Sequence, residues 1–234
     1  MDRSPVSLDA TTAEAAGPAP APVRTELGLL AMAAVWAVNF SVIKTALAEL
    51  PPLAFNALRF PLASLVAYAA LRRRGPIPRP AREDAARILA LGVLGNVVYQ
   101  LFFILGVART RAGNASLLLA GTPLLTALAS ALVGHERVGP RIWVGLAAAL
   151  AGMVLVVAGG AQAVGVEAGT FVGDVVLFGA SVSWAVYTVG SRGLVARYGP
   201  VAVTAWTLWI GTVGLVLLGL PGLAGVDWRA VSPR

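Results

Sequence analysis

Two basic residues lie inside long apolar stretches of the sequence, where a cation needs a chemical reason. Lys44 falls near the end of the apolar run 27–47, and Arg59 lies in the first half of the run 53–71. A cation at the centre of a bilayer costs about 2.5–3.5 kcal/mol on insertion scales. Attraction of an anionic or zwitterionic substrate would offset this cost. The alternative is that both side chains reach the membrane interface, with Glu49 as an ion-pair partner.

A row of polar and aromatic side chains follows one face of the apolar run 86–107. Asn96, Tyr99, Gln100 and Phe103 recur at i, i+3, i+4 and i+7, which places them on one side of an α-helix. Because amide and hydroxyl groups avoid lipid, we expect this face to point into a bundle of helices. The row predicts either the lining of a cavity or hydrogen bonds between helices, which contribute about 0.6 kcal/mol each.

A proline and a carboxylate mark two further positions of interest. Pro123 lies inside the run 112–133, where it removes a backbone hydrogen bond and is expected to kink the helix. Asp174 lies near the start of the run 171–191, where an anion suits the positive end of the helix dipole. We therefore expect Asp174 to cap its helix, and we include Pro123 among the candidates for a substrate pathway.

The sequence lacks the residue patterns of catalysis and of metal binding. It contains no cysteine and one histidine, which excludes thiolate chemistry and argues against a metal cluster. The segment from Gly179 to Ser183 lacks the last glycine of a Gly-x-Ser-x-Gly nucleophile turn, and no phosphate-binding loop occurs. The sequence therefore predicts neither an enzyme nor a cofactor.

The apolar runs that contain these residues predict an all-α, polytopic transmembrane helix bundle. Hydrophobic residues make up 58% of the chain and charged residues only 12%, whereas soluble domains carry about a quarter charged residues. Seven runs each approach the roughly 20 residues that cross a bilayer: 27–47, 53–71, 86–107, 112–133, 141–159, 171–191 and 200–220. Residues 1–24 are rich in alanine and proline and are expected to form a disordered cytoplasmic tail.

The arginines predict the orientation and the location of the chain. Six of them lie between Arg72 and Arg87, so this connection is expected to face the cytoplasm together with the N-terminus. Arg109 and Arg111 would then lie outside, which is a local disagreement. The net charge of +7 arises largely from such short loops, so we expect a lipid bilayer and no nucleic acid as partner. The preference for arginine over lysine is typical of GC-rich bacteria and favours a bacterial inner membrane.

An internal repeat emerges when the sequence is compared with itself at an offset of 148 residues. Trp36 then falls on Trp184 and Asn39 on Tyr187, in a register that also aligns two prolines. One repeat contains five helices, an odd number, so the second repeat must be inverted in the membrane, as in many secondary transporters. Aromatic residues near the middle of the membrane are expected to line a binding site between such repeats.

The repeat predicts how the chain is divided. Residues 25–160 form a first five-helix repeat, and residues 168–234 contain the first two helices of a second, inverted one. Seven helices are thus present of an expected ten. We therefore expect the chain to be a fragment of a ten-helix protein or the product of a truncated gene.

Short motifs in the first four runs point to a known family. They are Trp36, Asn39-Phe40 and Lys44, then Pro51-Pro52-Leu53 with Ala57-Leu58-Arg59-Phe60, and then Asn114-Ala115-Ser116 through Pro123. Together they resemble the EamA-type drug/metabolite transporters over residues 27–220, although His135 replaces the glycine of that family's Gly-Glu pair. The resemblance implies a ten-helix exporter or exchanger of metabolites and adds Asn114 and Ser116 to the candidate pathway residues.

These observations predict a secondary transporter that exports a small metabolite or amino-acid-like compound by alternating access. The alternative is a truncated, non-transporting membrane protein or an assembly subunit. Small multidrug exporters use a glutamate buried in the first helix, whereas Glu26 only borders that helix here.

On the fifth run, Gly145, Ala148, Ala149 and Gly152 permit close helix packing. We expect this packing within the chain, with a homodimer face as the alternative.

Overall fold

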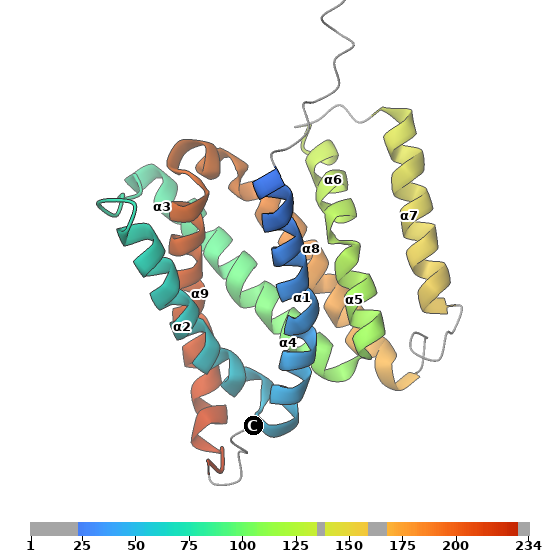
Figure 1. Ribbon diagram of the computed structural model, residues 1–234, viewed down its shortest axis with the longest axis horizontal. Coiled ribbons are helices and arrows are strands. Elements are labelled where there is room, and N and C mark those ends of the chain that lie inside the picture. The colour runs from blue at the N-terminus through green and yellow to red at the C-terminus, as the bar shows by residue number, and fades with distance from the viewer. Residues whose placement is uncertain (1–22, 135–138, 159–167, 229–234) are drawn as a thin grey trace, which may run out of the picture. The chain divides into compact units, whose positions relative to one another are not determined.

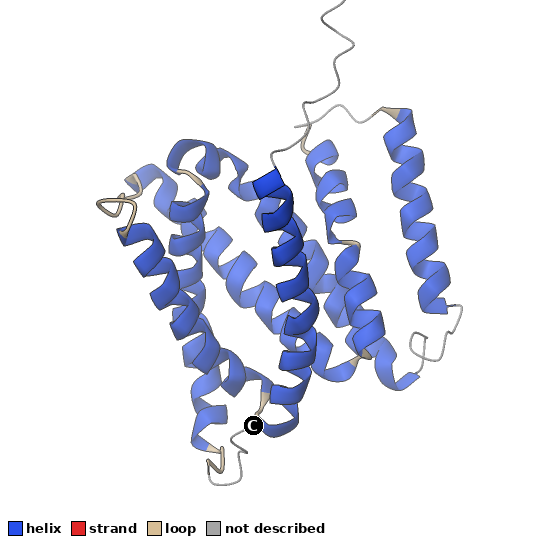
Figure 2. Cartoon of the chain, in the orientation of Figure 1, coloured by secondary structure: helices blue, strands red, loops and turns tan. Residues whose placement is uncertain are grey.

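The computed structural model describes residues 23–134, 139–158 and 168–228, and every regular element in these ranges is a helix (Figures 1 and 2). The elements are α1 (Val23–Glu49), α2 (Pro52–Arg72), α3 (Arg82–Gly92), η1 (Val93–Val98), α4 (Tyr99–Arg109), α5 (Ala112–Ala120), α6 (Thr122–Leu132), α7 (Pro140–Ala158), α8 (Ala168–Tyr198) and α9 (Pro200–Ala224). The predicted all-α helix bundle is confirmed. The chain divides within α1 into two units, Met1–Asn39 and Phe40–Arg234.

The helices coincide with the apolar runs of the sequence. Among the described residues, five helical stretches are long and apolar enough to cross a membrane, and they match five of the predicted runs: Pro52–Arg72, Arg82–Arg109, Ala112–Leu132, Phe171–Tyr198 and Pro200–Ala224. Helices α1 and α7 occupy the other two runs and have 27 and 19 residues. Some of their side chains lie outside the described set.

Two of the five stretches are irregular. The third predicted run is one continuous helix whose middle, η1, is π-helical. The fourth run is interrupted at Gly121, between α5 and α6, two residues before Pro123. Since proline cannot donate the backbone hydrogen bond of a continuing helix, the irregularity lies where the sequence predicts it.

Helices α2 and α9 pack against each other in an antiparallel arrangement, side by side in Figure 1. Gly219, late in α9, lies against Leu53 and Ala57 at the start of α2. Later in α2 and earlier in α9, the hydroxyl groups of Ser64 and Thr212 form a hydrogen bond of 2.6 Å. In the direction in which residue numbers rise along α2, they therefore fall along α9.

Helix α8 contributes to two apolar cores within the second unit. One core joins it to α4 and α5, and its fully buried members include Ile104, Val107 and Leu177. The other joins it to α3 and α9 through Leu194 and Val203, each 1% exposed. Apolar burial on both sides of α8 fixes the helices that surround the site described below.

Helix α7 differs from the prediction. Ala148 and Ala149 are exposed, and no atom lies within 4 Å of a Cβ built on Gly145 or Gly152. The prediction that this small-residue face packs within the chain is therefore wrong for the part of the chain that the structure describes. The homodimer alternative stays a prediction.

Candidate functional site

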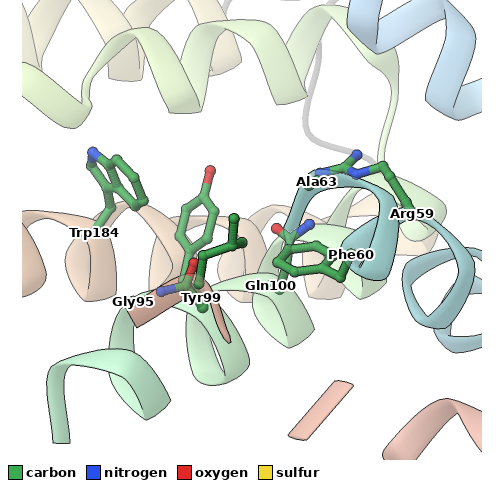
Figure 3. Close-up of a pocket in the computed structure, with 9 residues that line it drawn as sticks. Arg59, Phe60, Ala63, Gly95, Tyr99, Gln100 and Trp184 are labelled. Atoms are coloured by element: carbon green, nitrogen blue, oxygen red, sulfur yellow. The ribbon is translucent and has the colours of Figure 1, made fainter. Parts of the chain in front are cut away.

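A cavity of about 210 Å³ lies inside the second unit, bounded by α2, η1, α4, α8 and α9 (Figure 3). Its lining combines one cation, two amides and three aromatic rings with small and aliphatic groups: Arg59, Phe60, Ala63, Gly95, Asn96, Tyr99, Gln100, Trp184 and Leu208. Five of the twelve residues that we predicted as pathway candidates are thus brought together from three segments of the chain. The predicted face of the third run does point inward, since Gln100 and Phe103 are buried.

The π-helical segment η1 shapes one wall of this cavity. It supplies Gly95 and Asn96, and a Cβ atom on Gly95 would overlap the ring of Tyr187. The ring therefore lies directly against the backbone of η1, and its hydroxyl is 3.1 Å from that of Thr207. π-Helical turns inside α-helices are frequent at functional sites.

Aromatic rings form a continuous apolar wall beside η1. The ring centroids of Tyr99 and Trp184 are 5.0 Å apart, and those of Trp184 and Tyr187 are 5.2 Å apart. Phe103 extends the row on the other side of Tyr99, at 5.8 Å. Tilted and stacked pairs at these separations are attractive, so the rings position one another.

Arg59 lies on the opposite side of the cavity from Trp184 in the view of Figure 3, with Tyr99 between them. Its Nη1 atom is buried and has no hydrogen-bond partner, and the described residues offer it no ion pair. Arg59 therefore does not make the alternative pairing with Glu49, whereas a pairing of Lys44 with Glu49 stays a prediction because the Lys44 side chain lies outside the described residues. The guanidinium lies 5.6 Å from the ring centroid of Phe55 and 5.5 Å from that of Phe60.

The rings around Arg59 stabilise its charge but leave part of its hydrogen-bonding capacity unused. A cation within a membrane helix costs about 2.5–3.5 kcal/mol on insertion scales. A cation–π contact contributes about 0.5–1 kcal/mol at exposed sites and about 2 kcal/mol when it is desolvated. The phenyl rings do not satisfy the N–H groups, because they offer no ordinary hydrogen-bond acceptor. Within the described part of the chain, the guanidinium therefore has no anionic partner.

A second unsatisfied donor lies on the same face of α2. The side chain of Asn56 is fully buried, and its Oδ1 atom accepts a long hydrogen bond of 3.5 Å from Nε2 of Gln100. Its Nδ2 atom has no partner. Because Asn56 precedes Arg59 by three residues, the two side chains share one helix face. Two N–H donors on this face of α2, Nη1 of Arg59 and Nδ2 of Asn56, are thus left without an acceptor.

Asn114 and Asp174 belong to a different polar cluster. Asp174 is 7% exposed and accepts hydrogen bonds from the hydroxyl of Thr110 and, at 3.0 Å, from Nδ2 of Asn114. Helix α8 begins at Ala168, so Asp174 lies beyond its first turn. The prediction that Asp174 caps its helix is wrong, because the helix starts earlier than the apolar pattern indicates.

Within the second unit, the remaining pathway candidates whose side chains the structure describes are not among the lining residues. Ser116 is exposed and bonds to the carbonyl of Gly113, and Pro123 is exposed in the first turn of α6. Trp36 and Asn39 lie in the first unit. The side chain of Lys44 lies outside the described residues, as do His135 and Glu136. The ring of Tyr187 packs against Trp184 and Gly95, and Tyr187 is not among the lining residues.

Sequence reasoning missed four lining residues: Phe60, Ala63, Gly95 and Leu208. Phe60 and Ala63 are apolar members of an apolar helix, so their types carry no signal of a cavity. Gly95 had a usable signal, since a glycine inside a helix is unfavourable and indicates close approach of another group. Leu208 is identified only by the packing of α9.

Comparison with known proteins places these features in a family. The model of the EamA-like transporter family matches residues 23–158. The chain belongs to this family. It is 30% identical over 189 residues to an uncharacterized transporter of Archaeoglobus fulgidus, covering 81% of this chain and 64% of the relative. It is 31% identical to a probable terminal-alkyne amino-acid exporter of Streptantibioticus cattleyicolor, covering 76% of this chain and 58% of the relative.

A solved structure agrees with the fold of this EamA-like protein. One protein crystal structure covers 83% of the chain with 25% identity and a TM-score of 0.61, and the match spans 64% of that chain. The EamA-like chain thus spans less than two thirds of the length of the relatives it matches. Family and helices together make it a multi-pass membrane protein whose surroundings are the lipid bilayer.

Proposed function

We propose that this EamA-like protein is a secondary transporter that exports a small metabolite or amino-acid-like compound, with the cavity as its binding site. The observation that carries the proposal is a cavity with cationic and amide groups in the interior of an apolar helix bundle. Its volume of about 210 Å³ is below the roughly 300–1,000 Å³ typical of pockets for drug-sized ligands. Such a volume suits a metabolite, and the name of one relative supports an amino acid and export.

Alternating access between two inverted repeats is the proposed mechanism. In the repeat register of 148 residues, α2 corresponds to α9, and Ser64 corresponds to Thr212. The two helices pack antiparallel, and these two corresponding residues bond to each other. When equivalent residues meet, they lie close to the two-fold axis that relates their elements. The contact supports a pseudo-two-fold axis between α2 and α9, about which the repeats would rock.

Polar clusters at the two ends of α8 support a gating role for that helix. At its C-terminal end, Arg197 pairs with Glu83 at 2.7 Å and with Asp84 at 2.9 Å, and Tyr198 donates to Asp84 at 2.6 Å. Near its N-terminal end, Asp174 binds Thr110 and Asn114. Exposed ion pairs contribute little stability, so the first cluster can open at small cost. We infer that the two clusters break in turn as access alternates.

The proposed orientation places the N-terminus and the connection 73–81 in the cytoplasm of a bacterial inner membrane, because the arginines concentrate there. The chain has no cysteine, so single cysteines report their own location. In intact cells, we expect an impermeant maleimide to label Gly225→Cys and to leave Arg73→Cys unlabelled. The antiparallel packing of α2 and α9 places these two positions at opposite ends. Labelling of Arg73→Cys alone would reverse the orientation.

Transport itself is tested with the 234-residue chain, purified and reconstituted into liposomes loaded with a bacterial small-molecule extract. We expect mass spectrometry to detect release of at least one compound that protein-free liposomes retain. Release must stop when the compound is equal on both sides, because a secondary transporter requires a gradient. Absence of any protein-dependent release would favour the alternative of a non-transporting membrane protein or an assembly subunit.

A further inference from the structure

We propose that the cavity selects substrates with one carboxylate, which Arg59 binds, and with an apolar group that packs against Trp184 and Tyr99. The inference rests on the proposed transport function and names its substrate class. It also assigns Arg59 as the residue that determines specificity, and it predicts that analogues without the carboxylate are rejected.

The first argument is the unsatisfied state of Arg59. Its Nη1 atom is buried without a hydrogen-bond partner, and its aromatic neighbours Phe55 and Phe60 accept no ordinary hydrogen bond. A guanidinium presents its N–H groups in a rigid, planar fork that matches the two oxygens of a carboxylate. Asn56 adds an unpaired N–H on the same helix face. Donors that lack acceptors are complementary to an anion.

The second argument is the charge of the lining. Arg59 is its only charged residue among the described ones, and the polar groups that accompany it on Asn96, Tyr99 and Gln100 are neutral. An organic cation would therefore meet a like charge with no carboxylate to bind it. A single guanidinium balances a singly charged carboxylate, whereas a phosphate monoester with nearly two negative charges would leave one uncompensated.

The third argument is the apolar wall on the other side. Trp184 and Tyr99 present ring surfaces that pack against neighbouring rings in tilted and stacked pairs and so are held in place. Figure 3 shows Arg59 and Trp184 on opposite sides of the cavity. A ligand that contacts both sides has its carboxylate at one end and its apolar group at the other. An amino acid with an apolar side chain has this form, and the side-chain oxygens of Asn96, Tyr99 and Gln100 are the acceptors that the lining offers to its ammonium group.

The experiment compares acids with their amides. The full chain is purified in detergent, and calorimetry measures binding of L-leucine, L-methionine and L-phenylalanine. Each is compared with its carboxamide, which has nearly the same shape but lacks the carboxylate and is therefore mostly a cation at neutral pH. Inorganic phosphate is titrated as a second anion. We expect at least one acid to bind about tenfold or more tightly than its amide, because only the acid makes charge-assisted hydrogen bonds. Phosphate is expected to compete weakly.

Substitutions assign the selectivity to Arg59. Arg59→Gln should abolish the difference between acid and amide, and Arg59→Lys should retain part of it, because lysine keeps the charge and loses the fork. Arg73→Gln is the matched control, since Arg73 is exposed beyond the end of α2 and lies outside the cavity. It should bind the acids as the wild type does. If Arg59→Gln fails to fold, the comparison of acid with amide on the wild type still decides.

Several results would overturn the inference. They are equal binding of acids and amides, binding of none of the three acids, tighter binding of phosphate, or an acid preference that survives in Arg59→Gln. Release of only compounds that lack a carboxylate from the loaded liposomes would also overturn it while leaving transport established. Conversely, acid-selective binding without any release would contradict the transport function and leave the carboxylate site in place.

Discussion

Replacing Gly219 by leucine is expected to separate α2 from α9 and to destabilise the bundle. A Cβ atom at this position would lie 2.5 Å from the backbone oxygen of Leu53 and 2.5 Å from Cβ of Ala57. The neighbours are backbone and a methyl group rather than the end of a flexible side chain, so the helices themselves must move. Overpacking of this kind costs on the order of 1–3 kcal/mol and sometimes more.

The measurement is the midpoint of thermal unfolding in detergent, together with the elution profile of the purified chain. Gly145→Leu provides a matched control, because no described atom lies within 4 Å of a Cβ at Gly145 in α7. This control should unfold close to the wild-type temperature. If Gly219→Leu were as stable as Gly145→Leu, the close packing of α2 on α9 would be incorrect, and the proposed axis at Ser64 and Thr212 would lose its support.

Replacing Trp184 by alanine is expected to reduce release from loaded liposomes by about tenfold to a hundredfold. The change removes one wall of the cavity and two ring contacts, with Tyr99 at 5.0 Å and with Tyr187 at 5.2 Å. Each such pair contributes about 0.5–1.5 kcal/mol to holding the rings in place. A loss of about 1.4–2.8 kcal/mol of substrate binding energy at this wall corresponds to a tenfold to hundredfold change. The loss should be seen in the initial rate of release at equal amounts of reconstituted protein.

Two further variants separate a role in the pathway from a role in stability. Trp184→Phe keeps a ring against Tyr99 and should retain most of the release. Trp143→Ala makes the same change at an exposed tryptophan of α7, outside the cavity lining, and should release as the wild type does. Unchanged release by a well-folded Trp184→Ala would mean that the substrate does not pass this cavity.

Residue spacing and residue type predicted part of the cavity lining. The face formed by Asn96, Tyr99 and Gln100 was predicted from helical periodicity, and the three residues line one cavity. Arg59 was predicted because a cation inside an apolar helix is costly. The absence of an ion pair for Arg59 required coordinates, since Glu49 is close enough in sequence to serve as its partner. The lining by Phe60 and Leu208 had no sequence signal, because apolar side chains in apolar helices look alike wherever they point.

The sequence by itself determined the membrane-spanning helices of this protein and the family to which it belongs. Hydrophobic length and composition are local properties, and a backbone in lipid has few alternatives to a helix. Tertiary structure alone decided the π-helical form of Val93–Val98, against which the ring of Tyr187 packs at Gly95. It also decided that Asp174 joins Thr110 and Asn114 instead of capping α8, and that the Gly145 face of α7 is open. These outcomes depend on which helices meet, and that is set by pairs of residues far apart in the chain.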